Sequence, residues 1–253
     1  MSFNYDQTDV HLNYDTSRKL PEESLKLWMD AISEYVPKEL IKGIVDLGCG
    51  TARVSAALSN HFPAKVFGID PSRNMLMTAK KAIALPSIEF SQGSAEEIPL
   101  GNRVADLIFM SMVYHHIQDK TRAICEFKRV LRKDGFLCIR TSTADSIDSY
   151  PWVRFFPKAR QIELARVPSR KGIAAFLKGD GFALHKHSVI QQRFAENHQQ
   201  YFQKIGLRGL SSLKAITDAQ FQDGMKAFER YCVEQEKESA VYEDIDLFIF
   251  RMV

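Results

Sequence analysis

An apolar run at residues 44–47 leads directly into a Gly-x-Gly turn at residues 48–50. This pattern is typical of a buried parallel strand that feeds a helix, and the glycines leave bare backbone open for a ligand. A second strand-like run, at residues 66–69, ends in Asp70, 22 residues beyond Gly48. This is close to the spacing of roughly 20 residues at which a carboxylate reaches a ribose diol in a doubly wound sheet. The two loops together predict a crevice for one nucleotide-type ligand.

Strand-like and helical segments alternate between residues 41 and 143, which is the signature of βαβ units in a parallel sheet. The strand-like runs lie at residues 44–47, 66–69, 88–91, 106–110 and 136–141, and the helical stretches at residues 52–61, 72–84 and 119–132. Two further strands are expected at residues 183–194 and 245–250, the second of which closes the sheet. Right-handed crossovers then cover both faces. We therefore predict an α/β fold: a doubly wound, Rossmann-like, mostly parallel seven-stranded sheet with helices on both faces and a helical cap.

The rest of the chain supplies helices that flank this core. Apolar residues at helical spacing predict a leading helix at residues 21–36. Further helices are expected at residues 169–178, at residues 196–216 with interruptions at Gly206 and Gly209, and at residues 218–236 with Asp218 as the N-cap. The expected organisation is a single domain over residues 1–253, made of a cap segment and helix (1–40), a cofactor-binding core (41–145), substrate-facing cap elements with a late strand (146–240) and a closing strand (241–253).

The bulk composition restricts the class of protein. With 253 residues, of which 45% are hydrophobic and 26% charged, the chain can bury a sizeable core and is ordinary for a globular protein. Its net charge of +3 is too small to indicate polyanion binding, and its cysteines lack the spacing of a zinc site. The sequence shows neither a run of about 18 apolar residues nor a leader pattern. We therefore expect a cytoplasmic protein that does not enter a membrane.

Two residues around the glycine turn argue against a dinucleotide. Arg53 stands where the third glycine of Gly-x-Gly-x-x-Gly would allow tight helix packing around a pyrophosphate. Asp46 would repel a pyrophosphate but suits a ligand that carries an ammonium and a sulfonium charge. With these features, and with segments 93–99, 106–111 and 131–137 following in order, the chain resembles class I S-adenosylmethionine-dependent methyltransferases, in the small-molecule, quinone-biosynthesis-like (type 11) branch.

The resemblance implies S-adenosyl-L-methionine as the cofactor and S-adenosyl-L-homocysteine as the product. The glycine turn would approach the amino-acid end of the cofactor, with Asp46 as a counter-charge, and Asp70 would take the ribose hydroxyls. Met75 would pack on the adenine, and Ser94, in place of the acid usual in this family, would accept from the adenine amino group. The cofactor-binding residues expected on this basis are Tyr14, Arg18, Asp46, Gly48, Cys49, Gly50, Thr51, Asp70, Pro71, Ser72, Met75, Ser94, Ala95, Ser111 and Met112.

The segment after the fourth strand carries the candidate catalytic residues. Methyl transfer from a sulfonium is a direct displacement, so an enzyme contributes mainly alignment and the exclusion of water, and a strong base is optional. Tyr114, His115 and His116 lie beside the expected position of the methyl group. Any of the three could face the acceptor and take its proton near neutral pH, with His115 as the first choice. A histidine that caps the next helix is the alternative interpretation.

Two other groups of residues have weaker functional interpretations. His185 and His187 lie two apart on an expected strand and so share a face, as a metal pair would, but no third ligand is evident and a surface or hydrogen-bonding role fits better. No metal site is therefore predicted. Residues 151–180 contain seven basic residues interleaved with aromatic ones, which suits either an anionic or planar acceptor or a solvated helical face.

Three functions remain open from the sequence. The first is methyl transfer to an O, N, S or C atom of a small organic acceptor, because the long aromatic C-terminal portion can close over a pocket. The second is a tRNA-base methyltransferase with residues 154–171 as a phosphate track, against which the low net charge argues. The third is a non-catalytic module that binds the cofactor and docks a partner, since a fold alone does not show turnover. The oligomeric state is left open.

Overall fold

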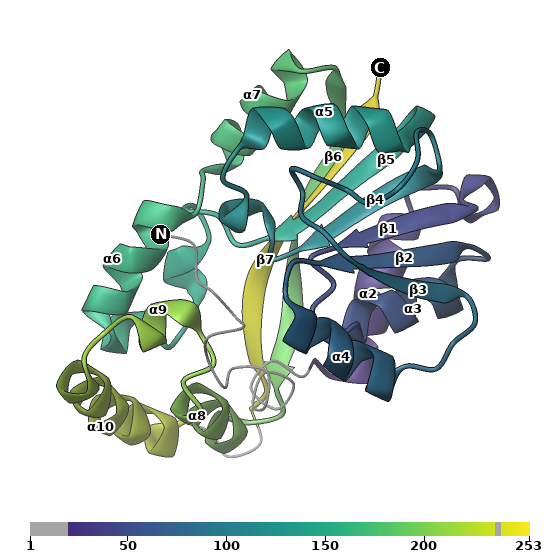
Figure 1. The fold of residues 1–253 in the computed structure, drawn as a ribbon. Helices are drawn as coiled ribbons and strands as arrows, with labels where there is room; N and C mark the ends of the chain where they lie inside the picture. Colours follow the sequence, from purple (N-terminus) through teal and green to yellow (C-terminus); the bar gives the residue numbers. More distant parts are fainter. Residues whose placement is uncertain (1–19, 236–238) are drawn as a thin grey trace.

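The computed structural model describes residues 20–235 and 239–253, which form a seven-stranded sheet with helices on both faces (Figure 1). The strand order is β3-β2-β1-β4-β5-β7-β6. Strands β1 to β5 are parallel, and β7 runs antiparallel between β5 and β6, so the predicted mostly parallel sheet is confirmed. The strands are β1 (Gly43–Leu47), β2 (Lys65–Asp70), β3 (Ile88–Gln92), β4 (Ala105–Ser111), β5 (Leu131–Thr141), β6 (Phe182–Ala195) and β7 (Val241–Met252).

Helices cover both faces of this sheet because each presents an apolar stripe to it. Helices α2 and α3 bury side chains such as Trp28 and Leu58 against one face, and α5 and α7 bury Phe127 and Leu177 against the other. The α-helices are α2 (Glu22–Ser33), α3 (Arg53–His61), α4 (Arg73–Ala82), α5 (Lys120–Val130), α6 (Pro157–Arg166), α7 (Arg170–Gly179), α8 (His198–Gly206), α9 (Ser211–Lys214) and α10 (Asp218–Glu234). Short 3-10 helices are η2 (Lys38–Leu40), η3 (Tyr114–His116), η4 (Ile147–Ser149) and η5 (Val153–Phe155).

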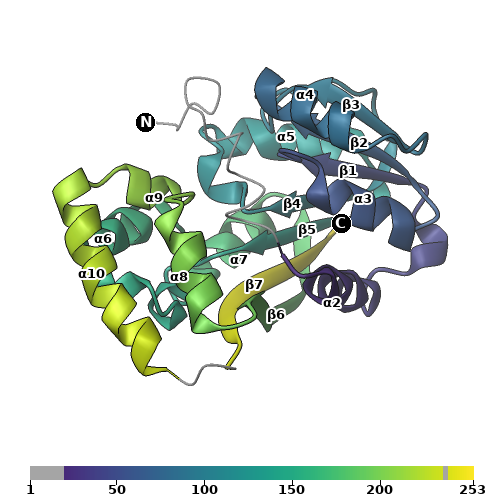
Figure 2. The ribbon, with the colours of Figure 1, turned by 90° about the horizontal axis from the view of Figure 1, so that it is seen from below.

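Helices α6, α8, α9 and α10 form a helical cap that lies to one side of the sheet (Figures 1 and 2). Aromatic rings hold the cap together: the ring centroids of Phe156 and Phe221 are 5.7 Å apart, and those of Tyr201 and Phe228 are 5.5 Å apart. The core cluster that contains Trp28 of α2 also contains these four residues. The cap therefore shares one apolar core with a face of the sheet.

The junction between α5 and β5 differs from the prediction. The helix ends at Val130 and the strand begins at the next residue, whereas the sequence predicted a helix to residue 132 and a strand from residue 136. The reason is a register shift: Ala105 pairs with Leu131, but Leu107 pairs with Phe136. Local periodicity does not reveal such an irregular ladder, because its pairing partner lies on another strand.

Two further details of the C-terminal part differ from the prediction. The N-cap of α10 is Thr217 rather than Asp218, because the Thr217 hydroxyl accepts from the Gln220 N–H while the Gln220 side chain accepts from the Thr217 N–H. Strand β7 inserts between β5 and β6, so that β6 forms the edge of the sheet. The predicted interruption of residues 196–216 is confirmed, since α8 ends at Gly206 and α9 begins at Ser211.

The two histidines of β6 lie on opposite faces of the sheet, so their predicted shared face is wrong. The ladder between β6 and β7 shifts register at His185, which is an extra residue on its strand. The ring of His185 lies 6.1 Å from that of Tyr35, which packs on the core beneath α2. The ring of His187 stacks 4.5 Å from Phe248, which belongs to the core on the other face. A metal pair from these two residues is therefore excluded by geometry.

Candidate functional site

The turn after β1 has a backbone that favours glycine. Gly48 and Gly50 have φ values of 71° and 55°. The N–H groups of Gly48 and Cys49 donate to the Ile69 carbonyl at 2.7 and 3.1 Å, which ties the turn to the end of β2. A Cβ atom on Gly48 would lie 2.3 Å from Cγ2 of Val113, whereas one on Gly50 would meet none of the described residues within 4 Å. The open side of the turn is therefore at Gly50.

Asp70 ends β2 and joins the glycine turn to the start of α4. Its carboxylate accepts from the N–H groups of Gly50 and Ser72, each at 2.9 Å, and the side chain is largely buried. Ser72 caps α4 by accepting from the Met75 N–H at 3.1 Å, and Pro71 between the two is exposed. The carboxylate thus accepts from the backbone of both loops at the point where the carboxyl ends of β1 and β2 meet.

Asp46 lies inside β1, beneath the glycine turn. Its side chain is 2% exposed and accepts from the Ser55 hydroxyl at 2.5 Å. Burial raises the pKa of Asp46 to about 7, the Ser55 hydrogen bond opposes this, and the charge of Asp70 adds to it. Near neutral pH the carboxyl group is therefore poised between its two forms, and a nearby cation would favour the charged one.

The loops after β3 and β4 reach the same edge of the sheet as the glycine turn. Ser94 exchanges two backbone hydrogen bonds with Glu97, at 3.2 and 3.3 Å, and Ala95 is buried. Ser111, the last residue of β4, accepts from Nη1 of Arg140 at 2.9 Å. The carboxyl ends of four adjacent parallel strands thus bring together most of the residues that the sequence assigned to the cofactor.

His115 and His116 line a cavity beside Met112, whose φ is 60°. The two imidazole ring centroids are 4.2 Å apart. Tyr114 instead packs in the core on the α5 face of the sheet, with Nζ of Lys120 lying 5.5 Å from its ring centroid. Burial raises the pKa of Tyr114 to about 12. We therefore leave Tyr114 out of the proposed catalytic group.

The cavity has a volume of about 60 Å³ and lies between the histidine loop and the cap. Part of its wall comes from residues 147–211, which belong to the elements expected to face the substrate (146–240). Apolar and polar groups contribute about equally to the wall. Its apolar members, besides Met112, are Ile147, Tyr150, Trp152, Val167, Phe194, Ile205, Leu210 and Ile245. Its polar members, besides the two histidines, are Ser142, Glu163, Arg166, Ser211 and Glu243.

Two buried carboxylates in this wall, Glu163 and Glu243, were missed from the sequence. Glu163 accepts from Nη2 of Arg166 at 2.7 Å, and Glu243 accepts from the Tyr201 hydroxyl at 3.3 Å. A signal for Glu243 was present, because residues 241, 243, 245, 247 and 249 share one face of β7 and the other four are apolar. A carboxylate in an otherwise apolar row marks a buried polar site.

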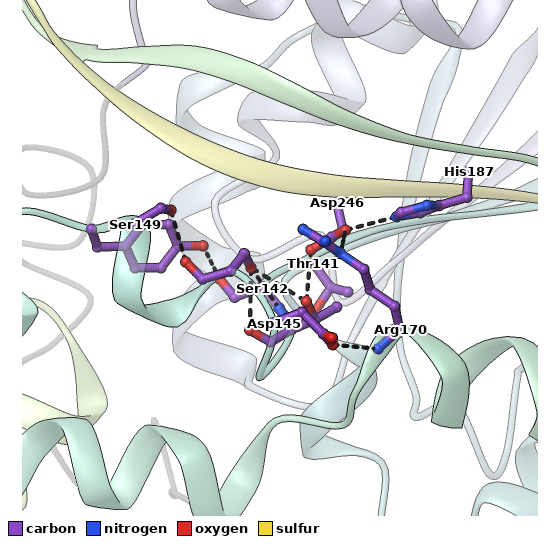
Figure 3. Close-up of polar contacts among 10 residues, drawn as sticks. Thr141, Ser142, Asp145, Ser149, Arg170, His187 and Asp246 are labelled. Atoms are coloured by element: carbon purple, nitrogen blue, oxygen red, sulfur yellow. Dashed lines mark hydrogen bonds and ion pairs between the residues drawn. The ribbon is translucent and has the colours of Figure 1, made fainter.

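A buried network beside the cavity anchors the segment that follows β5 (Figure 3). Asp246 of β7 is fully buried and accepts from the Thr143 hydroxyl at 2.8 Å and from Nε of Arg170 at 2.7 Å. Nε2 of His187 lies 2.7 Å from the same carboxylate, so His187 has the predicted hydrogen-bonding role. Asp145 accepts from the Arg170 N–H at 2.8 Å. The network therefore fixes the loop that carries Ser142 and leads to Tyr150.

Several arginines of the basic stretch between residues 151 and 180 are held in ion pairs. Arg160 pairs with Asp148 at 2.6 Å, Arg166 with Glu163 at 2.7 Å, and Arg170 with Asp246 at 2.7 Å. Guanidinium groups that are engaged in this way do not form an open track for phosphates.

Tyr14 and Arg18 lie outside the described residues. Within residues 20–235 and 239–253, no group of three or more His, Cys, Asp or Glu side chains is arranged to hold a metal ion. In the same part of the chain, every helix is too short or too polar to span a membrane.

Comparison with known proteins bears on the same region. A family model described as a methyltransferase domain matches residues 45–139, which contain the four loops of the site. The ubiquinone/menaquinone biosynthesis C-methyltransferase UbiE of Campylobacter jejuni subsp. jejuni serotype O:23/36 (strain 81-176) is 33% identical over 114 residues, which cover 43% of this chain and 47% of the relative. The chain thus spans about half the length of the curated relatives it matches.

Solved structures share the fold over nearly the whole chain. A proposed methyltransferase of an antibiotic biosynthesis pathway from Anabaena variabilis ATCC 29413 has a TM-score of 0.73 at 19% identity, with 94% of this chain and 99% of that chain covered. A phosphoethanolamine N-methyltransferase 2 of Haemonchus contortus, solved with phosphomonomethylethanolamine and S-adenosylhomocysteine, has a TM-score of 0.62 at 16% identity, with 96% and 56% covered. The chain therefore resembles a methyltransferase domain over residues 45–139 and shares its fold with these solved methyltransferase structures.

Proposed function

We propose that this chain transfers the methyl group of S-adenosyl-L-methionine to a small organic acceptor. One observation carries the proposal: the glycine turn, Asp70 and the histidine loop meet at one edge of the sheet, beside a cavity that the cap encloses. In open α/β sheets, ligands bind outside the carboxyl ends of the strands where the strand order reverses. In this sheet the order reverses between β1 and β4, which carry the glycine turn and the histidine loop.

The residues at this edge fit such a cofactor. The open side of the turn at Gly50 leaves room for the amino-acid end, and the Asp70 carboxylate suits the ribose hydroxyls. Asp46 supplies a buried counter-charge beneath the turn, which a bound cation would hold in its ionised form. The proposed set is completed by neighbouring loop residues, namely Cys49, Thr51, Pro71, Ser72, Met75, Ser94, Ala95, Ser111 and Met112.

When bound, S-adenosyl-L-methionine supplies a methyl group on a sulfonium, which a nucleophile displaces directly. In this proposal the protein positions the acceptor and excludes water from it. Met112 and the walls of the cavity enclose the acceptor, and a ring nitrogen of His115 or His116 takes a proton from it where the acceptor atom carries one.

The enclosed cavity supports a small acceptor rather than a nucleic acid. Its wall combines apolar and polar side chains and is built in part from cap residues, whereas a tRNA substrate would need a continuous basic surface. Three arginines that could contribute to such a surface are already held in ion pairs: Arg160 with Asp148, Arg166 with Glu163 and Arg170 with Asp246. Methyl transfer to a small molecule is therefore the function that the geometry supports best.

Calorimetric titration of the full chain with S-adenosyl-L-methionine and S-adenosyl-L-homocysteine tests the cofactor assignment. We expect saturable binding of both, and we expect Asp70→Asn to weaken it by about tenfold or more, since a charge-assisted hydrogen bond contributes about 1.5–3 kcal/mol. Asp244→Asn, on the face of β7 opposite Glu243, is the matched control and should keep wild-type affinity. A folded protein that binds neither ligand would overturn the proposal.

Turnover separates an enzyme from a binding module. Release of S-adenosyl-L-homocysteine in the presence of a panel of small alcohols, phenols, amines, thiols and carboxylic acids should identify an accepted class. Cofactor binding without turnover of any member would favour the non-catalytic module. Binding of bulk tRNA with a steep dependence on salt concentration would favour the nucleic-acid alternative.

A further inference from the structure

Ser142 lies where the end of the sheet meets the cavity. It follows β5 directly, and β5 pairs in parallel with β4, so the segments that leave the two strands start side by side. The Met112 N–H donates to the Arg140 carbonyl at 2.8 Å, which holds the loop of His115 and His116 against the end of β5. Ser142 and Met112 therefore line one cavity together with both histidines of that loop.

The Ser142 hydroxyl takes part in two hydrogen bonds within the cavity wall. Its oxygen is 2.7 Å from the Tyr150 hydroxyl, and it donates to Sδ of Met112 at 3.8 Å. A serine has one hydrogen to donate, so a bond donated to sulfur makes Tyr150 the donor in the other pair. Burial raises the pKa of Tyr150 above the ordinary tyrosine value, and the charge of Glu243 raises it further, so this residue keeps its proton. Tyr150 thus donates to Ser142, and Ser142 donates to Met112.

The segment that carries these hydroxyls is firmly anchored. The Thr143 hydroxyl, next to Ser142, donates to the fully buried Asp246 at 2.8 Å, and Tyr150 is 6% exposed. Ser142 itself is partly exposed and forms part of the cavity wall. A polar group that is fixed by its neighbours and still reaches a cavity is pre-positioned to bind a ligand.

The bond from Ser142 to sulfur is one that a ligand can replace. A thioether is a weak acceptor, whereas an oxygen accepts at shorter range and more strongly. The hydrogen bond that Ser142 receives from Tyr150 polarises its own hydroxyl and strengthens it as a donor. An oxygen that enters the cavity near Met112 would therefore gain a better hydrogen bond than the one it displaces.

We propose, on the basis of the methyl-transfer function above, that Ser142 donates a hydrogen bond to a carbonyl oxygen of the acceptor molecule, in place of the bond to Met112. The chemical class is a small carbonyl compound, such as a ketone, an amide or an ester. A carbonyl oxygen suits this position because it accepts without adding a further hydrogen to two hydroxyls that already share one. Ser142 is then a residue that distinguishes an oxygenated acceptor from a molecule of the same shape without the oxygen.

Two probes of the same planar shape test the proposal: 4-fluoroacetophenone, which presents a carbonyl oxygen, and 4-fluoro-α-methylstyrene, which presents a methylene group in its place. Fluorine NMR measures the affinity of each for the full chain, with and without S-adenosyl-L-homocysteine. The probes differ in hydration, so the informative quantity is the response of each affinity to loss of the hydroxyl. We expect Ser142→Ala to lower the ketone affinity about fivefold, on the scale of one net hydrogen bond, and to change the alkene affinity less than about twofold.

Ser149→Ala is the matched control, because it removes a hydroxyl of the same segment that donates to the Ser146 carbonyl at 2.7 Å. It should leave both affinities at wild-type values. Tyr150→Phe keeps the donor of Ser142 and removes only its polarisation, so the ketone affinity should fall by no more than about twofold. A larger loss in Tyr150→Phe than in Ser142→Ala would make Tyr150 the donor and overturn the assignment. Circular dichroism and the melting temperature establish that the variants are folded.

Three further results would overturn the carbonyl site: unchanged ketone affinity in Ser142→Ala, an equal loss of ketone and alkene affinity in that variant, or no binding of the ketone at millimolar concentration. The proposed methyl transfer fails separately, by absence of S-adenosyl-L-homocysteine binding in calorimetry. A ketone site that depends on Ser142 in a protein that does not bind this ligand would leave the carbonyl assignment standing and remove the enzyme assignment.

Discussion

Asp46 links the chemistry of the glycine turn to the stability of the fold. Burial raises its pKa from 3.8 to about 7, so the folded state binds this proton more tightly than the unfolded state does. The favourable contribution of the group is therefore full below about pH 4 and is lost as the pH rises to about 7. Above that pH the buried carboxylate destabilises the protein unless a cation lies near it.

Asp46→Asn should raise the free energy of unfolding at pH 8 by on the order of 3 kcal/mol and change it little at pH 4. The amide oxygen retains the hydrogen bond from Ser55, whereas the buried charge is gone. The same variant should bind S-adenosyl-L-methionine less tightly, because the counter-charge is lost. Urea unfolding at both pH values and calorimetry measure these effects. An equal gain at the two pH values would contradict the pKa assignment, and wild-type affinity would contradict the counter-charge.

Glycine is required at positions 48 and 50 of the turn for different physical reasons, and alanine substitutions should distinguish them. Gly50→Ala should lower the free energy of unfolding by about 1 kcal/mol, since its φ is left-handed, and weaken S-adenosyl-L-homocysteine binding at least tenfold because a methyl group enters the open side. Gly48→Ala should destabilise the fold more, because its Cβ would lie 2.3 Å from Val113 Cγ2. Thermal unfolding and calorimetry compare the two. Unchanged affinity in Gly50→Ala would show that the ligand does not use this side.

Residues fixed by motif spacing could be predicted from the sequence, and residues fixed by long-range contacts could not. The glycine turn and Asp70 lie where the pattern of strand, turn and helix put them. Glu243 was missed because its partners, Tyr201 and the cavity wall, come from distant segments. Tyr114 was grouped with the histidines because it is next to them in the sequence. Neighbours in sequence need not face the same way, and Tyr114 packs in the core while the two histidines line the cavity.

At the scale of elements, the Asp246 network joins β7, β6, α7 and the segment after β5 (Figure 3). Three side chains from separate elements converge on one carboxylate that is fully buried. A buried charge of this kind is tolerated only while its partners are in place. The segment from Ser142 to Tyr150, which lines the cavity, is therefore expected to depend on it.

Asp246→Asn should lower the free energy of unfolding by about 3 kcal/mol, because Arg170 is left without its buried anion. Amide hydrogen exchange should become faster in residues 142–150, while S-adenosyl-L-homocysteine affinity stays unchanged, since the network lies away from the glycine turn. Asp148→Asn, which breaks the exposed pair with Arg160, is the control and should alter stability little. Wild-type exchange rates in Asp246→Asn would show that the network does not hold this segment.

Element type followed from periodicity, but element ends and faces depended on pairing. Strands β1 to β4 lie within one or two residues of the predicted runs, because each is a short apolar run between turn signals. The bulge at His185 and the irregular start of β5 depend on the register of neighbouring strands, which local sequence does not encode. The N-cap of α10 lies one residue before the predicted position, because Thr217 and Gln220 form reciprocal hydrogen bonds.

At the scale of the whole molecule, one apolar core runs from α2 across a face of the sheet into the cap. The two tryptophans of the chain occupy its two ends. Trp28, on the buried face of α2, donates from Nε1 to Gln192 at 2.9 Å, and the Arg140 guanidinium lies 4.6 Å from its ring centroid. Trp152, in the cap, has its ring centroid 6.1 Å from that of Phe156. Because both side chains are fully enclosed, each reports on its own end of the core.

A shared core predicts that sheet and cap unfold together. In Trp28→Phe the remaining fluorescence reports on the cap, and in Trp152→Phe it reports on the contact between α2 and the sheet. We expect the urea transition followed by fluorescence to coincide with that followed by far-ultraviolet circular dichroism in each variant, as for a two-state unit. Trp28→Phe should be the less stable of the two, by on the order of 1 kcal/mol, because it also removes the hydrogen bond to Gln192. A cap transition at lower urea than the circular dichroism transition would instead make the cap a separately folding unit, and the cavity it encloses would then open without loss of the sheet.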